Sequence, residues 1–236
     1  MPDAVLPHGY RLHVTEYAEV ARAETERGEV VLRRRTSEVA ADVLELRVNG
    51  VFVMDTLETT SEIELAAQAL EVVEEPRRVV VGGLGLGYTL QRVLADPRVE
   101  TVAVVEIEEA LVGWMRDGTV PHGPALLADQ RVTVVNADIS MAIAEARSTY
   151  DLVLLDVDNG PGHLVHAANE EVYGADFLGR CREVLAPGGV LVVWSANAAP
   201  ALMDEMQEVF GAAEEQAHDV LLQDRPEEFF LYLARR

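Results

Sequence analysis

Three acidic residues each close an apolar run that predicts a buried strand. Glu106 ends ETVAVVE, Asp138 ends QRVTVVNAD and Asp156 ends YDLVLLD. The carboxyl ends of parallel strands gather at one edge of a sheet, where ligands bind. A carboxylate at Glu106 can accept hydrogen bonds from ribose hydroxyls, and one at Asp138 can accept from the exocyclic amine of adenine. The three acids therefore predict a nucleoside site, with Asp156 at the mouth of the same cleft.

A glycine-rich loop, in VVVGGLGLGYTL at 79–90, precedes these acids. We expect the backbone at Gly83, Gly85 and Gly87 to approach the ligand closely, because glycine has no side chain in the way. The spacing G-x-G-x-G lacks the third position of the dinucleotide pattern G-x-G-x-x-G, which argues against NAD. The predicted ligand is an adenosyl sulfonium, S-adenosylmethionine or a relative. Ile107 and Ile139, which follow two of the acids, are expected to contact it.

Transfer of a group from a sulfonium needs an aligned nucleophile and one proton acceptor. The candidates for that base are Asp156, Asp158 and His163, with His166 as a further choice. For both histidines, an ordinary surface or capping role is favoured over a place at the cleft mouth. The segment DVDN resembles a divalent-metal loop, but with two acids and no clustered histidines no metal is expected.

Predicted strands and helices position these residues, and they alternate along most of the chain. Period-2 runs between residues 10 and 55, with turn signals at ERGE and NG, predict a small antiparallel sheet. From residue 61 onward helical segments alternate with apolar strands, and two final runs predict an antiparallel pair. The predicted fold is α/β: a doubly wound, mostly parallel sheet with a small N-terminal antiparallel β appendage. The expected division is 1–60 and 61–236.

Composition excludes several classes of function. The 236 residues carry a formal charge of -22, which disfavours nucleic-acid and membrane partners, and no apolar run has transmembrane length. A cytoplasmic protein is expected. All 19 basic residues are arginine, so a lysine nucleophile is excluded. The single cysteine, Cys181, is expected to be a small buried apolar residue, and the triplet 33–35, RRR, a solvated edge.

The chain resembles the spermidine synthase (polyamine aminopropyltransferase) family, a branch of the class I methyltransferase fold. The resemblance is carried by the glycine-rich loop with the strand that follows it, by YDLVLLDVDNGPG, and by RVTVVNAD, NEEVYGADF and LAPGGVLVVW. The resemblance covers roughly residues 45 to 210. It implies an N-terminal β-sheet domain, a homodimer, and a small-molecule acceptor such as an amine. It also aligns Tyr173 with a family aromatic that either lines the acceptor site or packs its helix against the sheet.

Three positions depart from the family pattern. Leu86 stands where an aspartate would hold the aminopropyl ammonium of the donor. Asn159 replaces the second acid of the catalytic loop, and Val53 replaces a glutamine. We therefore expect an S-adenosylmethionine-dependent transferase, with methyl transfer to a small molecule as the first interpretation. Aminopropyl transfer from decarboxylated S-adenosylmethionine is the alternative, and a non-catalytic nucleoside-binding module is the third.

Overall fold

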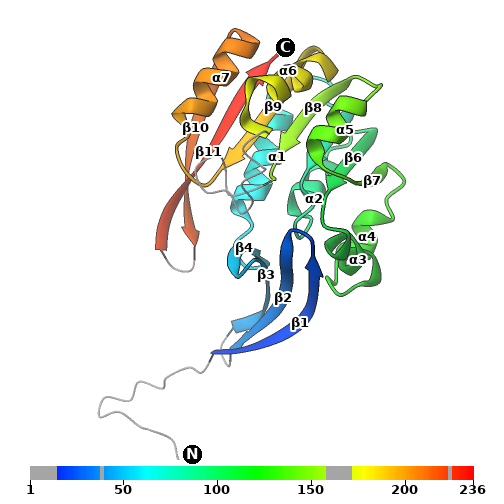
Figure 1. The fold of residues 1–236 in the computed structure, drawn as a ribbon, viewed down its shortest axis with the longest axis vertical. Coiled ribbons are helices and arrows are strands. Elements are labelled where there is room, and N and C mark those ends of the chain that lie inside the picture. Colours follow the sequence, from blue (N-terminus) through cyan, green and yellow to red (C-terminus); the bar gives the residue numbers. More distant parts are fainter. Residues whose placement is uncertain (1–14, 38–39, 158–171, 223–224) are drawn as a thin grey trace, which may run out of the picture.

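The computed structural model describes residues 15–37, 40–157, 172–222 and 225–236, which form two sheets. A four-stranded sheet near the N-terminus lies below a seven-stranded sheet in the view of Figure 1. Helices accompany the larger sheet, so the chain combines a β unit with an α/β unit. This arrangement agrees with the fold class predicted from the sequence.

The small sheet is a meander of four antiparallel strands in the order β1-β2-β3-β4. Asn49 and Gly50 connect the last two strands with φ angles of 52° and 77°. Positive φ at both central residues is the requirement of a type I′ hairpin turn, which the NG pair predicted. The strands are β1 (Thr15–Thr25), β2 (Gly28–Ser37), β3 (Ala40–Val48) and β4 (Val51–Asp55).

The large sheet has the strand order β10-β11-β9-β8-β5-β6-β7. Five strands are parallel, and β11 pairs antiparallel with both β9 and β10. The chain first builds outward from β5 to β7 and then returns to place β8 on the other side of β5, so the strand order switches between β5 and β8. The bounds are β5 (Arg78–Gly82), β6 (Thr101–Glu106), β7 (Val132–Asn136), β8 (Tyr150–Leu155), β9 (Leu185–Ser195), β10 (Ala213–Leu222) and β11 (Arg225–Arg235).

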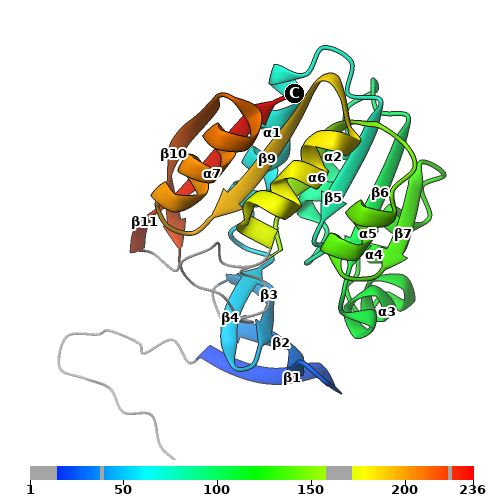
Figure 2. The same cartoon turned by 45° about the horizontal axis from the view of Figure 1, so that its top comes forward.

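Helices cover both faces of this sheet, because its central strands are apolar on both sides. In β5, Val79 and Val81 pack into one core cluster with α1, α2 and α3, whereas Val80 packs into a second cluster with α5, α6 and α7. Figure 2 shows α6 and α7 in front of the sheet. The helices are α1 (Thr60–Val72), α2 (Tyr88–Leu94), α3 (Glu109–Asp117), α4 (Gly123–Leu127), α5 (Ile139–Glu145), α6 (Ala175–Val184) and α7 (Pro200–Phe210).

The small sheet shares its core with the α/β unit. Val30, Leu32, Leu46 and Met54 are buried in the same cluster as residues of α1 and α2. Burial of this apolar surface ties β2, β3 and β4 to the larger unit. The division at residue 60 therefore stays a prediction about chain organisation, with one hydrophobic cluster crossing it.

The structure also places the arginine triplet 33–35 and Cys181. Arg33 and Arg35 pair with the buried carboxylates Glu45 (2.6 Å) and Asp55 (3.2 Å), so these two members of the arginine triplet neutralise acids within the small sheet. Cys181 is fully buried in the second core cluster, and burial raises the pKa of its thiol. In the described parts of the chain, every helix is too short or too polar to span a bilayer.

Gly83, directly after β5, lies against the end of β8. Its φ is +95°, and a Cβ atom there would stand 2.0 Å from the carbonyl oxygen of Asp156. The backbone amide of Asp156 donates to the Gly82 carbonyl (2.8 Å), so the two strand ends are fixed close together. A side chain at residue 83 has no room without separating them.

We expect Gly83→Ala to lower the free energy of unfolding by about 3 kcal/mol, because it adds backbone strain to a steric clash. Gly113→Ala in α3 is the matched control: a Cβ there meets nothing within 4 Å. That change should stabilise the protein by about 0.5–1 kcal/mol through helix propensity. Denaturant unfolding of both variants measures the difference, and equal effects would contradict the packing described here.

Candidate active site

A pocket opens at the carboxyl edge of the parallel sheet, beside the switch between β5 and β8. The small sheet supplies one wall, and the loops after β5, β6, β7 and β8 supply the other. Ligands bind at this place in open α/β sheets. The residues that line it are Arg27, Val30, Leu46, Val48, Val53, Met54, Ser61, Glu62, Gly83, Gly85, Val105, Glu106, Ile107, Glu108, Leu111, Ala137, Asp138, Ile139, Asp156, Val157, Val172 and Trp194.

Glu106, at the end of β6, organises the floor of this pocket. One carboxylate oxygen accepts from the amide of Leu84 (2.9 Å) and the other from the amide of Glu108 (2.8 Å). Burial raises the pKa of Glu106, and these hydrogen bonds oppose the rise. Each oxygen has a second lone pair, so the predicted contact with ribose hydroxyls is compatible with this role. Glu106 therefore also fixes the glycine loop.

Packing within the protein requires glycine at these loop positions, which the sequence analysis did not predict. Gly83 and Gly85 line the pocket, but a Cβ on Gly85 would stand 2.7 Å from the sulfur of Met54. Gly87 lies outside the lining, and a Cβ there would stand 2.7 Å from Cε of Met115. Close packing of the protein on its own loop thus accounts for each glycine. The contact of Gly87 with a ligand stays a prediction.

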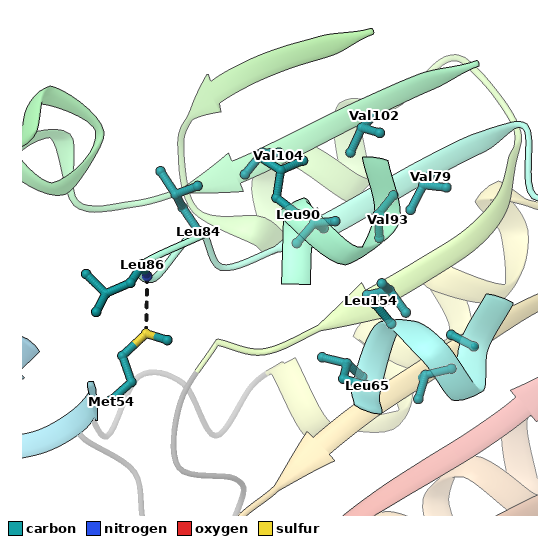
Figure 3. Close-up of a cluster of buried hydrophobic side chains, with 14 of the residues drawn as sticks. Met54, Leu65, Val79, Leu84, Leu86, Leu90, Val93, Val102, Val104 and Leu154 are labelled. Atoms are coloured by element: carbon teal, nitrogen blue, oxygen red, sulfur yellow. Dashed lines mark hydrogen bonds between the residues drawn. The ribbon is translucent and has the colours of Figure 1, made fainter. Parts of the chain in front are cut away.

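Leu86 turns into the core instead of the pocket. Its side chain is fully buried, its amide donates to the Met54 sulfur (3.2 Å), and its carbonyl oxygen lies 2.6 Å from Nε2 of His122. Figure 3 shows Met54 from β4 meeting the loop at this residue. The loop therefore contributes no acid to the pocket at the position where the family pattern has one.

The loop after β7 brings the predicted adenine-side residues to the same pocket. Asp138 is the N-cap of α5 and accepts from the amide of Ser140 (2.7 Å) through one carboxylate oxygen. Ile139 is 6% exposed, whereas Ile107 after β6 is 37% exposed. All three line the pocket, as expected from their places at the strand ends. Capping occupies one oxygen of Asp138, and the other accepts no hydrogen bond from the described residues.

Asp156 lies at the end of β8 among other acids. Its carboxyl group forms a hydrogen bond with Thr89, the second residue of α2. Removal from bulk water, together with the charges of Glu62 and Glu106, raises the pKa of Asp156 to about 8. A carboxyl group with that pKa holds its proton at neutral pH and can exchange it during a reaction near neutral pH.

Glu62 is a pocket residue that the sequence analysis missed. It is 8% exposed, and it begins the buried stripe of α1 that continues through Leu65, Ala66, Ala69 and Leu70. This spacing of i, i+3, i+4, i+7 and i+8 is the core-facing stripe of a helix. An acid on an otherwise apolar stripe was the available signal.

The small sheet and β9 contribute lining that no local motif indicated. Arg27, in the β1–β2 turn, pairs with Glu108 at 2.7 Å across the pocket edge. Oε2 of Glu108 and Nε1 of Trp194 are buried and have no hydrogen-bond partner among the described residues. These atoms offer an acceptor and a donor at the pocket wall.

Several residues that were predicted for the site do not line the pocket or lie outside the described residues. Asp158, Asn159, His163 and His166 lie outside the described residues. Tyr173 is 6% exposed and packs in the core cluster that α5, α6 and α7 share. It is not among the described residues that line the pocket. Within the described ranges, no three His, Cys, Asp or Glu side chains are arranged to hold a metal ion.

Comparison with known proteins identifies the family. A model of the spermine/spermidine synthase domain matches residues 59–219, more than half of the chain. The chain belongs to the spermine/spermidine synthase family. Polyamine aminopropyltransferase 2 of Caldanaerobacter subterraneus subsp. tengcongensis is 27% identical over 181 residues, and that of Ralstonia nicotianae is 33% identical over 164 residues. These matches cover 72% and 66% of this chain, but only 58% and 30% of the two relatives.

Solved structures of spermidine synthases share the fold of this family member. One, in complex with the transition state analogue AdoDATO, superposes with a TM-score of 0.76 at 15% identity and covers 92% of this chain and 73% of that one. The spermidine synthase of Thermotoga maritima gives a TM-score of 0.74 at 15% identity, covering 92% and 72%. At this identity the likeness establishes the fold alone.

The raised pKa of Asp156 generates a prediction about stability. An acid whose pKa is about 8 in the folded protein and near 4 when unfolded takes up a proton on folding between those pH values. Its contribution to stability is present below pH 4 and is lost as pH rises towards 8. We expect Asp156→Asn, which cannot ionise, to be more stable than the wild type at pH 9 by about 2–4 kcal/mol and similar at pH 4.

Urea unfolding between pH 4 and pH 9 measures this difference. Asp204→Asn, on the exposed face of α7, is the control and should follow the wild type at every pH. Parallel stability profiles for Asp156→Asn and the wild type would show that Asp156 ionises normally in the folded protein.

Proposed function

We propose that this protein transfers an aminopropyl group from decarboxylated S-adenosylmethionine to an amine. The observation that carries the proposal is the charge of the pocket. Among the described residues, five acids and a single arginine, Arg27, line it, and Arg27 already pairs with Glu108. The five are Glu62, Glu106, Glu108, Asp138 and Asp156. Acidic groups therefore outnumber basic ones, and those that are ionised favour ligands that carry positive charge and no acid group.

The same surplus separates the two candidate donors. S-adenosylmethionine carries a carboxylate at the end of the chain on its sulfur, whereas the decarboxylated form carries only an ammonium there. Two like charges about 6 Å apart repel by roughly 3 kcal/mol at an effective dielectric constant near 20. The pocket therefore favours the decarboxylated donor. The curated relatives, both polyamine aminopropyltransferases, support this alternative over methyl transfer, which the sequence alone favoured.

The strand-end residues have matching roles in this proposal. Glu106 accepts hydrogen bonds from the ribose hydroxyls, Asp138 accepts from the adenine amine, and Ile107 and Ile139 supply apolar contact to the purine. Gly83 and Gly85 leave the backbone bare beside the sulfur-bearing chain. Each role is supported by the position of the residue in one pocket.

Asp156 is the proposed proton acceptor. In aminopropyl transfer, a bond forms between the acceptor nitrogen and the carbon next to sulfur, and the carbon–sulfur bond breaks. The electron pair of the broken bond stays on sulfur, which leaves neutral 5′-methylthioadenosine, and the surplus proton on nitrogen passes to a base. The raised pKa of Asp156 brings its proton affinity close to neutral pH, as general-base catalysis requires. Asp158 and His163 stay predicted alternatives for this base.

Product analysis tests the proposal. We expect 5′-methylthioadenosine to form from decarboxylated S-adenosylmethionine only when an amine such as 1,3-diaminopropane, putrescine or spermidine is present. Asp156→Asn should lower kcat by about 10²–10⁴-fold, whereas Asp204→Asn should leave it unchanged. Formation of S-adenosylhomocysteine from S-adenosylmethionine would instead establish methyl transfer. Nucleoside binding without any product would support the binding module.

A further inference from the structure

Glu62 is a buried acid with no cationic partner among the described residues. Its side chain is 8% exposed and lines the pocket from the first turn of α1. Ser61 donates a hydrogen bond to its Oε2 (2.8 Å), but none of the ion pairs among the described residues includes Glu62. A buried carboxylate without a counter-charge is costly, and a cationic ligand would relieve that cost.

The groups around Glu62 make the local charge more negative. Glu58 and Asp55 raise its pKa together with burial, and Asp55 is itself paired with Arg35. Burial raises the pKa of the neighbouring Tyr88 hydroxyl, and the charges of Glu62 and Asp55 raise it further. No cation from the small sheet or from α2 thus neutralises Glu62 within the described structure.

Thr89 connects Glu62 to Asp156. Its hydroxyl lies 3.4 Å from the carbonyl oxygen of Glu62 and also bonds to the carboxyl group of Asp156. The first turn of α1 and the end of β8 are therefore held together across α2. Two acids from distant parts of the sequence face one pocket at this point.

Two unsatisfied polar atoms belong to residues that line the pocket. The indole nitrogen of Trp194 and Oε2 of Glu108 are buried at its wall, and neither has a hydrogen-bond partner in the described part of the protein. Buried polar atoms are nearly always satisfied in native proteins. A molecule with both donors and acceptors would satisfy them.

We propose that Glu62, together with Asp156, binds the primary ammonium group of the aminopropyl donor. This inference rests on the proposed function and names the residue that supplies the negative charge at that end of the donor. Leu86 is buried away from the pocket and supplies none. The product 5′-methylthioadenosine has no ammonium group, so the Glu62 contact would hold the donor but not the product.

Binding of two nucleosides tests this assignment. Calorimetry would compare decarboxylated S-adenosylmethionine with 5′-methylthioadenosine on the wild type and on Glu62→Gln. We expect the variant to bind the donor about 10–100-fold more weakly, because a charge-assisted hydrogen bond is lost. Its affinity for 5′-methylthioadenosine should change less than threefold, which also shows that the variant is folded. Glu62→Asp, which keeps the charge, should recover part of the affinity.

Glu71→Gln, on the exposed face of the same helix, is the matched control and should bind both nucleosides as the wild type does. Equal weakening of both ligands by Glu62→Gln, or no change in either, overturns the assignment. The assignment also fails if the wild type holds the donor no more tightly than the product. The product analysis tests the proposed function separately. If turnover depends on an amine but Glu62→Gln binds the donor as the wild type does, this inference is wrong and the proposed function is still supported.

Discussion

The hydrogen bonds of one buried carboxylate determine the shape of the pocket. Glu106 accepts the amide of Leu84 from the glycine loop and the amide of Glu108 from the loop after β6. Without these bonds, two amides and a carboxylate would be buried unsatisfied, at a cost of about 1–3 kcal/mol for each group. The backbone of two neighbouring strand ends therefore follows the position of one side chain. The pocket floor exists because β5 and β6 end side by side.

Packing of the small sheet completes this arrangement. Met54 of β4 contacts both Gly85 and the amide of Leu86, so the N-terminal unit presses directly on the glycine loop. The hydrophobic cluster that crosses between the units gives this contact a rigid support. Arg27 and Glu108 close the far edge with an ion pair. The small sheet thus acts as a wall of the site, which explains why its inward residues are apolar and tightly buried.

The sequence predicted the parts of this structure that depend on local pattern. Continuous apolar runs such as 79–81 and 152–155 are typical of strands buried on both faces, and Asn49 with Gly50 can form the observed turn. Acids at strand ends then identified the pocket, because parallel strands place their carboxyl ends together. The local sequence pattern could not predict that Glu62 points into the pocket or that Leu86 is buried. Both depend on contacts with Thr89 and Met54, which come from other segments.

Burial gives the pocket acids two properties at once. Low local polarity raises the proton affinity of Asp156, and the charge of Glu62 raises it further. A cation placed between the two carboxyl groups acts in the opposite direction, because it favours their ionised forms. The ligand that fits the charge of the pocket would therefore also convert Asp156 towards the form that accepts a proton. Binding and activation of the base then have one electrostatic cause, and an uncharged nucleoside occupying the same space would leave Asp156 protonated.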